Sequence, residues 1–258
     1  MNDSLYIAAT GMQAQQQNLD TIANNLANLA TPGFKAGRVN FQDLVYRMGQ
    51  PAASGEAQSG ALAHGSGVGV LSLSRQFMMG EMKRTDAPLD VAIGGPGFFE
   101  VSLPDGSHAY SRGGSLQVNA DGFLASADGN MLKPGIHIGT DVKAITITTD
   151  GKVMVQGNDQ SSPSEVGSVE LSRFSDPSAL QPLGQNMYRA TAQSGEPIYG
   201  RPGENGMGAL SQGFTEMSNV NMINEMVNLM TAQRAYEMNV KVIQAADEML
   251  GMSNNLRK

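Results

Sequence analysis

Histidine, cysteine and serine are the side chains through which proteins most often bind a metal ion or supply a nucleophile. The three histidines, His64, His108 and His137, lie in separate predicted loops or strands, and the chain contains no cysteine. A metal site needs two or more ligands at a recognisable spacing, which these histidines do not provide. No Gly-x-Ser-x-Gly elbow presents a serine nucleophile. The sequence therefore predicts no catalytic residue, no cofactor and no metal site.

The glycine- and aspartate-rich stretches are better explained by turns than by ligand binding. "HGSGVG" (64–69) lacks the GxGxxG spacing, and no helix is expected after it, so a phosphate cradle is not predicted. The Asp-Gly pairs lack the alternating oxygen ligands of a calcium loop. Each pair is instead typical of a reversal between two strands, and the four pairs occupy positions 105–106, 121–122, 128–129 and 150–151.

Composition excludes several classes of function. Hydrophobic residues make up 40% of the 258 residues, charged residues only 16%, and the net charge is −7. A nucleic-acid or anionic-membrane binder needs a concentrated basic face, which this acidic chain does not offer. No apolar run is long enough to span a bilayer. No Lys or Arg precedes Lys35, so a Sec-type signal is not expected, and these features alone would favour the cytoplasm.

The first 30 residues have the spacing of a helix that packs along another helix. Two rows of mostly apolar residues each recur every seven positions and lie three positions apart, which is a heptad pattern. The bulky residues expected at this contact are Leu5, Met12, Leu19, Ile22, Leu26 and Leu29. An ordinary amphipathic helix has a charged back, whereas here the back is Asn, Gln, Thr and Ala. Pro32 and Gly33 are expected to end the helix and allow a turn.

Residues 218–258 mirror this pattern at the other end of the chain. Apolar residues follow alternating three- and four-residue steps, and Asn219 is the expected helix N-cap. Gln233 within this pattern is a candidate polar register device. We expect Arg234 and Tyr236 at contacts between subunits. The alternative is that Arg234 is a solvated side chain and Tyr236 a core residue. The predicted contact residues are Met222, Met226, Leu229, Gln233, Arg234, Tyr236, Val240, Ile243 and Leu250.

The residues between the helices predict many short β-strands. Runs such as "GFFEVSL" (97–103) are separated by Gly, Pro, Asn and Asp. Phe98 and Phe99 alternate on their strand, so one is expected in the core and the other is free to face a neighbour. The fold class is therefore α+β. Its predicted parts are a helix over 1–30, an extended linker or β region over 31–75 that includes a flexible segment at 48–67, a β-rich domain over 76–205, a return linker over 206–217 and a helix over 218–258.

Two sparsely charged helices at opposite ends of one chain are poorly stabilised by each other alone. A single partner helix leaves each of them marginal, and their polar backs can be buried against further helices through amide contacts. Faces that complement one another head to tail build rings or open filaments. We therefore expect the helices to form a coiled-coil-like bundle shared by several copies, and to be frayed in a solitary chain.

Three stretches of the sequence resemble the axial rod and hook proteins of the bacterial flagellum. "TIANNLANLATPGFKA" (21–36) is similar to the N-terminal signature of the family, and residues 90–129 and 218–250 are similar to its β-domain and its C-terminal helix. The matches lie in order and, with the strands between them, cover most of the chain. The residues that carry the N-terminal signature are Asn24, Asn25, Leu26, Asn28, Thr31, Gly33 and Phe34.

Within this family the chain is most similar to the members that build the distal rod, and the segment over 48–67 resembles the part that bridges their subunits. The resemblance implies a self-assembling, non-enzymatic subunit of a hollow drive shaft that crosses the periplasm and transmits torque to the hook. It implies export through the flagellar type III apparatus without a cleaved signal, in place of the cytoplasm. The implied partners are further copies, proximal rod proteins, hook or hook–rod junction proteins, and the P- and L-ring proteins, without nucleic acid or membrane insertion.

Two alternatives stay open at this point. A proximal rod or hook-type member of the same family would show similar motifs, although hook proteins are usually longer. A secreted adhesive or carbohydrate-binding β-protein belongs to a different class. It would favour exposed aromatic platforms, yet tryptophan is absent and aromatic residues total only 5%. A glycan-binding screen separates this adhesive class from a structural rod subunit.

Overall fold

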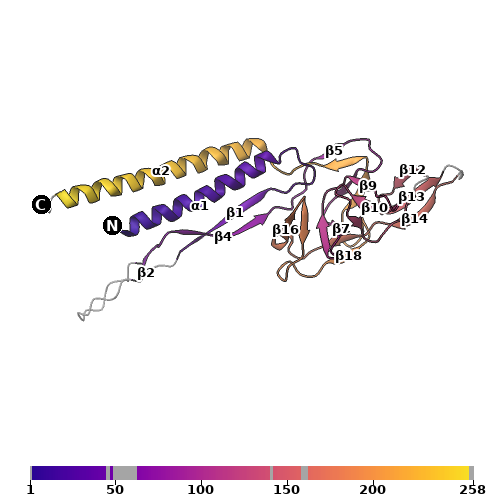
Figure 1. The fold of residues 1–258 in the computed structure, drawn as a ribbon, viewed down its shortest axis with the longest axis horizontal. Helices are drawn as coiled ribbons and strands as arrows, with labels where there is room; N and C mark the ends of the chain where they lie inside the picture. Colours follow the sequence, from indigo (N-terminus) through magenta and orange to yellow (C-terminus); the bar gives the residue numbers. More distant parts are fainter. Residues whose placement is uncertain (1, 45–46, 49–62, 140–141, 158–161, 256–258) are drawn as a thin grey trace. The chain divides into compact units, whose positions relative to one another are not determined.

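The computed structural model describes residues 2–44, 47–48, 63–139, 142–157 and 162–255. It has the predicted α+β composition, with one long helix near each end of the chain and short strands between them (Figure 1). The chain divides into two compact units. The helical unit comprises residues 1–26, 37–74 and 222–258, and the β unit comprises residues 27–36 and 75–221.

The helical unit contains the helices α1 (Asn2–Ala27) and α2 (Met222–Asn255), which lie side by side and run in opposite directions (Figure 1). They approach closely at Gly11, where an added Cβ would lie 3.0 Å from the Asn239 side-chain nitrogen. The short strands of this unit form two pairs, β1 (Gly37–Asp43) with β4 (Val68–Arg75) and β2 (Arg47–Met48) with β3 (Ala63–His64). Most of the segment 48–67 that resembles the bridging part lies outside the described residues.

The first helix ends earlier, and the second helix begins later, than the sequence predicted. α1 ends at Ala27 because the following residues turn, with the Thr31 amide donating to the Asn28 carbonyl at 3.2 Å. α2 begins at Met222 rather than at 218. The prediction that Asn219 caps this helix is wrong, because its amide group bonds three residues in two other segments. Its oxygen accepts from the Ala36 amide, and its nitrogen donates to the carbonyls of Gln76 and Met78.

The β unit is built from four sheets. The largest follows the order β16-β17-β8-β7-β11-β10-β9, with β15 paired to both β7 and β18. Its strands are β7 (Phe98–Ser102), β8 (His108–Ser111), β9 (Leu116–Val118), β10 (Leu124–Ser126), β11 (Met131–Leu132), β15 (Leu171–Arg173), β16 (Gln181–Gly184), β17 (Met187–Arg189) and β18 (Ile198–Gly200). A short 3₁₀ helix, η1 (Pro177–Ala179), precedes β16.

The other three sheets are small and antiparallel. One contains β12 (Val142–Ile147), β13 (Lys152–Gly157) and β14 (Ser164–Ser168). The remaining two are the pairs β6 (Val91–Gly94) with β19 (Ala209–Gln212) and β5 (Met82–Arg84) with β20 (Phe214–Glu216). The prediction of a return linker over 206–217 is therefore wrong. These residues form two strands because each pairs with a strand from the start of the β unit.

The four Asp-Gly pairs lie in hairpin turns, as predicted. Each hairpin joins consecutive strands, namely β7–β8, β9–β10, β10–β11 and β12–β13. In every turn the glycine has a positive φ between +78° and +86° and its amide donates to the carbonyl three residues earlier. This geometry is a type I turn followed by a left-handed residue, which glycine adopts without steric cost.

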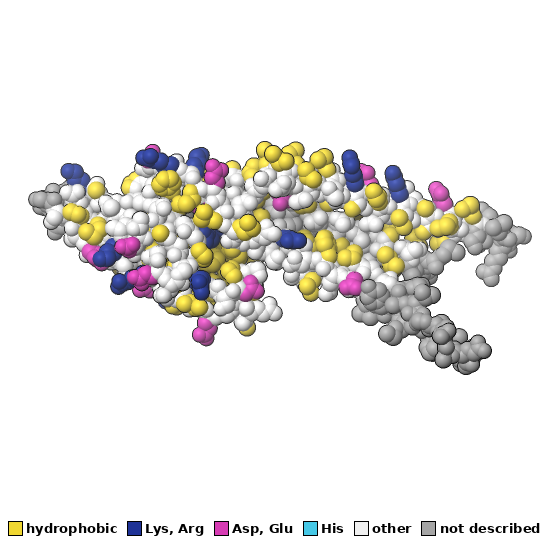
Figure 2. Space-filling model, turned by 180° about the vertical axis from the view of Figure 1, so that it is seen from behind, with side chains coloured by type: hydrophobic (Ala, Val, Ile, Leu, Met, Phe, Trp, Pro, Cys, Tyr) yellow, Lys and Arg dark blue, Asp and Glu magenta, His cyan; other side chains and the backbone are white. Residues whose placement is uncertain are grey.

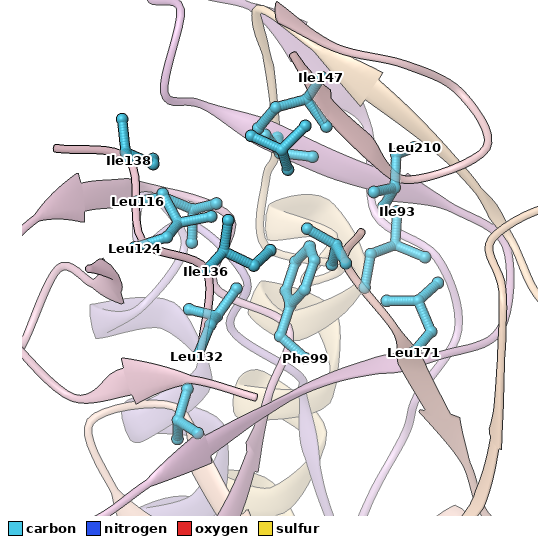
Figure 3. Packing of buried hydrophobic residues seen from close by; sticks show 14 of the residues in the cluster. Ile93, Phe99, Leu116, Leu124, Leu132, Ile136, Ile138, Ile147, Leu171 and Leu210 are labelled. Atoms are coloured by element: carbon cyan, nitrogen blue, oxygen red, sulfur yellow. The ribbon is translucent and has the colours of Figure 1, made fainter. Parts of the chain in front are cut away.

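Phe98 and Phe99 on β7 lie in two different hydrophobic clusters. Phe99 belongs to the main core, where Figure 3 shows it between Ile136 on one side and Ile93 and Leu171 on the other. Phe98 packs edge-to-face against Phe77, Phe174 and Tyr188 in a second, aromatic cluster. The expectation that one ring would be free to face a neighbouring molecule is wrong, because the second face of β7 is covered by the chain itself.

Candidate assembly surfaces and the buried junction

The predicted contact residues of α1 are covered to different degrees within one chain. Ile22 is buried, and Leu5, Met12, Leu19 and Leu26 are half-buried. The sixth residue of the set, Leu29, lies beyond α1 in the β unit, where it packs against Phe34, Ala36 and Val220.

α2 has one covered face along its length. Ala232 and Ala246 are buried, and the predicted contact residues Leu229, Val240, Ile243 and Leu250 are half-buried. A helix turns by about 100° per residue. On that geometry Leu229, Ala232, Ile243, Ala246 and Leu250 all fall on one side of the helix, and this side is covered within the chain.

The opposite face of α2 is exposed and carries many large apolar side chains, among charged ones such as Glu237 and Lys241. Of the predicted contact residues, Met222, Met226, Gln233, Arg234 and Tyr236 are exposed. Further exposed apolar side chains, which the predicted set left out, are Ile223, Val227, Met230, Met238, Val242, Met249 and Met252. Figure 2 shows hydrophobic side chains along the upper right edge, where α2 runs in that view. Their signal in the sequence was the presence of apolar residues on both sides of the helix.

Of the family-signature residues, Asn25 is buried in a specific contact. Its side-chain oxygen accepts from the Gly37 amide at 2.8 Å and its nitrogen donates to the Gly37 carbonyl at 2.9 Å. The side chain is only 2% exposed. Asn25 thus satisfies both polar groups of one backbone residue. Asn24 and Asn28 are exposed and half-buried, respectively, and each has an interaction partner.

The segment 31–36 of the signature is held inside the β unit by hydrogen bonds. The Gly33 amide donates to the Glu216 carbonyl at 2.8 Å, and the Ala36 carbonyl accepts from the Gln76 amide at 2.9 Å. Phe34 is buried under the Arg75 guanidinium, which lies 5.0 Å from the ring centroid. We call residues 31–36, together with the residues that hold them at 75–80, 112 and 216–220, the buried junction after its buried centre at Lys35, Arg112 and Glu216.

Gly33 is needed at its position for two reasons, and its replacement is a test of the junction. Its φ is +70°, and an added Cβ would lie 3.1–3.2 Å from backbone atoms of Arg112 and Gly113. We expect Gly33→Ala to lower the free energy of unfolding by about 1–3 kcal/mol. Gly106→Ala is the matched control, since Gly106 has a φ of +79° with nothing within 4 Å of the added carbon. Chemical denaturation of both variants should show the larger loss for Gly33→Ala, and equal losses would contradict the close packing described here.

Lys35, Arg112 and Glu216 form a buried ion triad at the centre of the junction. Glu216 Oε1 accepts from Lys35 Nζ at 2.6 Å and from the Gly80 amide at 2.8 Å, while Glu216 Oε2 lies 2.9 Å from Arg112 Nε and Nη2. The side chains of all three residues are at most 2% exposed. The remaining donors of Arg112 reach the carbonyls of Ile93, Gly95 and Gly97.

The triad places two cations around one carboxylate, and this shapes both pKa values. Burial alone would raise the pKa of Glu216, but the charges of Arg112 and Lys35 and the donated hydrogen bonds outweigh it and hold the pKa below its usual value. Burial lowers the pKa of Lys35 and the Arg112 charge adds to this effect, against the opposing influence of Glu216. Glu216 is therefore the group on which both cations depend. Sequence reasoning missed the triad because its members are 181 and 104 residues apart along the chain.

The histidines have no arrangement suited to catalysis or metal binding in the described part of the chain. His108 Nδ1 lies 3.2 Å from a Glu100 carboxylate oxygen, and His137 packs edge-on against Phe123. His64 lies on β3, and its side chain is outside the described residues. Among the described residues no group of three or more His, Cys, Asp or Glu could hold a metal ion. None of the described helices is both long and apolar enough to cross a bilayer.

Comparison with known proteins places these features in a family. Three family models match in chain order, namely "Flagella basal body rod protein" over 5–35, "Flagellar hook protein FlgE/F/G D1 domain" over 92–155 and "Flagellar basal body rod FlgEFG protein C-terminal" over 211–256. The flagellar basal-body rod protein FlgG of Borreliella burgdorferi is 43% identical over the full length of both chains. The chain belongs to the flagellar basal-body rod family.

Other rod proteins match at the same full-length scale. FlgG of Caulobacter vibrioides is 42% identical over 98% of this chain and 99% of its own, and FlgG of Bacillus subtilis is 35% identical over 99% of each. The chain is accordingly a structural subunit of the flagellar basal-body rod, of the distal-rod type that its sequence resembled, and not an enzyme. This family membership replaces the reading as an adhesive protein. The family model over 5–35 covers the N-terminal signature of the rod subunit. The family model over 211–256 covers β20, Asn219 and α2.

Proposed function

We propose that this rod subunit assembles helically with further copies into a hollow, stiff shaft, and that α1 and α2 form its shared coiled-coil-like inner bundle. The shaft transmits torque from the motor to the hook. The residues proposed at the contacts between copies are the predicted residues on both helices that are not already buried within one chain, together with further exposed apolar residues of α2. The exposed residues added to that set are Ile223, Val227, Met230, Met238, Val242, Met249 and Met252.

The observation that carries this proposal is that large apolar side chains lie on both sides of α2, on the exposed side among polar and charged ones. One side is covered within the chain, while ten large hydrophobic side chains of α2, most of them on the other side, are 36–72% exposed. So many exposed apolar side chains along one helix are typical of a surface that other protein copies cover. Burial of such a side chain stabilises by about 1.5–3 kcal/mol, so a row of them strongly favours contact with further helices. A contact of one face with a different face of the next copy builds a filament when the rotation between copies does not close into a ring.

The wider assignments rest on family membership. We propose that the rod subunit is exported through the flagellar type III apparatus without a cleaved signal and lies in the part of the basal body that spans the periplasm. Its partners would then be proximal rod proteins, hook or hook–rod junction proteins, and the P- and L-ring proteins. The segment over 48–67 is proposed to bridge neighbouring copies and stiffen the shaft.

Deletion of the segment over 48–67 should leave the β unit folded and make the polymer more bendable in electron micrographs. Unchanged filament curvature would reject the bridging role.

A charge on the exposed face of α2 tests the proposed assembly. Val227 is 51% exposed on α2, and we expect Val227→Asp to raise the concentration needed for polymer formation about a hundredfold, because the carboxylate would have to be buried between copies. Sedimentation and electron microscopy of the purified full chain measure this effect. Val166→Asp is the matched control, since Val166 is 37% exposed on β14 in the β unit. Polymers from Val227→Asp at the wild-type concentration would contradict the proposed role of this face.

A further inference from the structure

The methionines of α2 are all on its exposed face. The helix contains six, and each is between 50% and 64% exposed. At about 100° per residue they fall within one half of the helix circumference, opposite the face formed by Leu229, Ala232, Ile243, Ala246 and Leu250. The covered face of α2 thus uses leucine, isoleucine and alanine, and thioethers are confined to the other. The six residues are Met222, Met226, Met230, Met238, Met249 and Met252.

The distribution of methionines elsewhere makes this face chemically distinct. In the β unit Met187 and Met207 are buried in the core at 5% and 6% exposure. Met78 and Met79, the other two strongly exposed methionines of the described chain, lie in the connection between β4 and β5. A peroxide in solution would therefore reach the sulfurs on α2 and in this connection well before those of the core.

We propose that peroxide-class oxidants modify the α2 methionines of the free rod subunit and thereby block its entry into the polymer, while assembled copies are protected. This inference rests on the proposed assembly through the exposed face of α2. Oxidation turns a flexible apolar side chain into a polar one, so the same face no longer gains by burial. The device would stop damaged subunits from being added to the shaft.

The reaction is balanced with hydrogen peroxide as the oxidant. The thioether sulfur attacks one peroxide oxygen, the O–O bond breaks, and an S–O bond forms. The sulfur loses two electrons, and the departing hydroxide takes up the displaced proton and leaves as water. A methionine sulfoxide reductase with a dithiol reverses the change, releasing water and forming a disulfide. Oxidation and its reversal can therefore be applied to the same sample.

The test compares the wild-type full chain with two sets of leucine substitutions. One variant carries Met→Leu at the six α2 positions, and the control carries Met78→Leu and Met79→Leu. After peroxide treatment, confirmed by peptide mass, we expect the wild type and the control to need about tenfold or more higher concentration to polymerise. The α2 variant should polymerise equally before and after treatment, and polymers made before treatment should resist sulfoxide formation on α2.

Other outcomes decide against the inference in distinct ways. Oxidised wild-type chain that carries sulfoxides on α2 and polymerises normally would overturn it, as would equal inhibition of the α2 variant. If the α2 variant fails to polymerise even untreated, reductase treatment of oxidised wild-type chain decides instead. Recovery of polymer with loss of the α2 sulfoxides supports the inference, and loss of sulfoxides without recovery overturns it. An untreated wild-type chain that stays monomeric overturns the proposed assembly and this inference with it.

Discussion

Glu216→Gln should destabilise the β unit by about 3–5 kcal/mol, because it leaves the buried cations Lys35 and Arg112 without their shared anion. The amide nitrogen of glutamine would in addition place a donor where the carboxylate now accepts. For a unit of this size the loss corresponds to a drop in Tm of roughly 10 °C. The chain has no tryptophan, so tyrosine fluorescence and circular dichroism of the full chain measure the transition.

Lys35→Met separates the loss of the anion from the loss of any polar group at this site. This variant removes the cation whose pKa is already lowered by burial and by Arg112. It keeps the Arg112–Glu216 pair, the Gly80 amide bond and most of the side-chain volume. We expect a cost of about 1–2 kcal/mol, clearly smaller than for Glu216→Gln. Equal losses for the two variants would show that Glu216 is not the group that holds the triad together.

The same carboxylate predicts a pH dependence with a definite sign. Because the pKa of Glu216 is lower in the folded chain than its ordinary value of 4.5, the ionised group stabilises the fold at neutral pH. This contribution declines as the pH falls below about 4.5 and is lost once the pH passes through the lower folded-state pKa. The free energy of unfolding of the wild type should therefore fall more steeply with acidification than that of Glu216→Gln. Parallel curves for the two proteins would contradict the lowered pKa.

In a dilute monomer, the amides of α2 should exchange with solvent roughly a thousandfold faster than those of β7. The difference corresponds to about 4 kcal/mol in the free energy of local opening. All the residues of β7 are buried or nearly so, whereas α2 has one face covered and the other exposed. Hydrogen–deuterium exchange with peptide resolution measures both elements in one sample.

Assembly should reverse this difference for the helix alone. In the polymer, α2 amides should become strongly protected, while exchange in β7 and β8 stays as in the monomer and serves as the internal control. Digestion of the dilute monomer with a protease should likewise trim the two ends and leave the β unit intact. If α2 exchanges as slowly as β7 in the monomer, the helices are stable without neighbours, and the need for shared packing disappears.

Sequence reasoning was most successful where a few adjacent residues determine the conformation. The four Asp-Gly hairpins were predicted correctly because a left-handed glycine after a type I turn is a local requirement. The two terminal helices followed from periodicity over many residues. The family followed from the signature around Asn25 and Gly33, which the full-length relatives confirm.

Non-local contacts decided the features that the sequence did not reveal. Asn219 was expected to cap α2, yet its amide group bonds residues of two segments that are far from it in sequence. The segment 206–217, which was expected to be a linker, forms the strands β19 and β20 because they pair with β6 and β5. Lys35 has no unusual neighbours in sequence. It is the buried partner of Glu216 because the fold brings these two distant residues into contact.

The sequence by itself determined that apolar residues lie on more than one side of α2, since this follows from residue types and helical spacing alone. Only the tertiary structure decided which side is covered within the chain and which remains exposed, with all six methionines on the exposed one. The physical reason is that periodicity reports the directions of side chains around one helix. Burial depends on what lies in each direction, and that is set by contacts between residues distant in the chain.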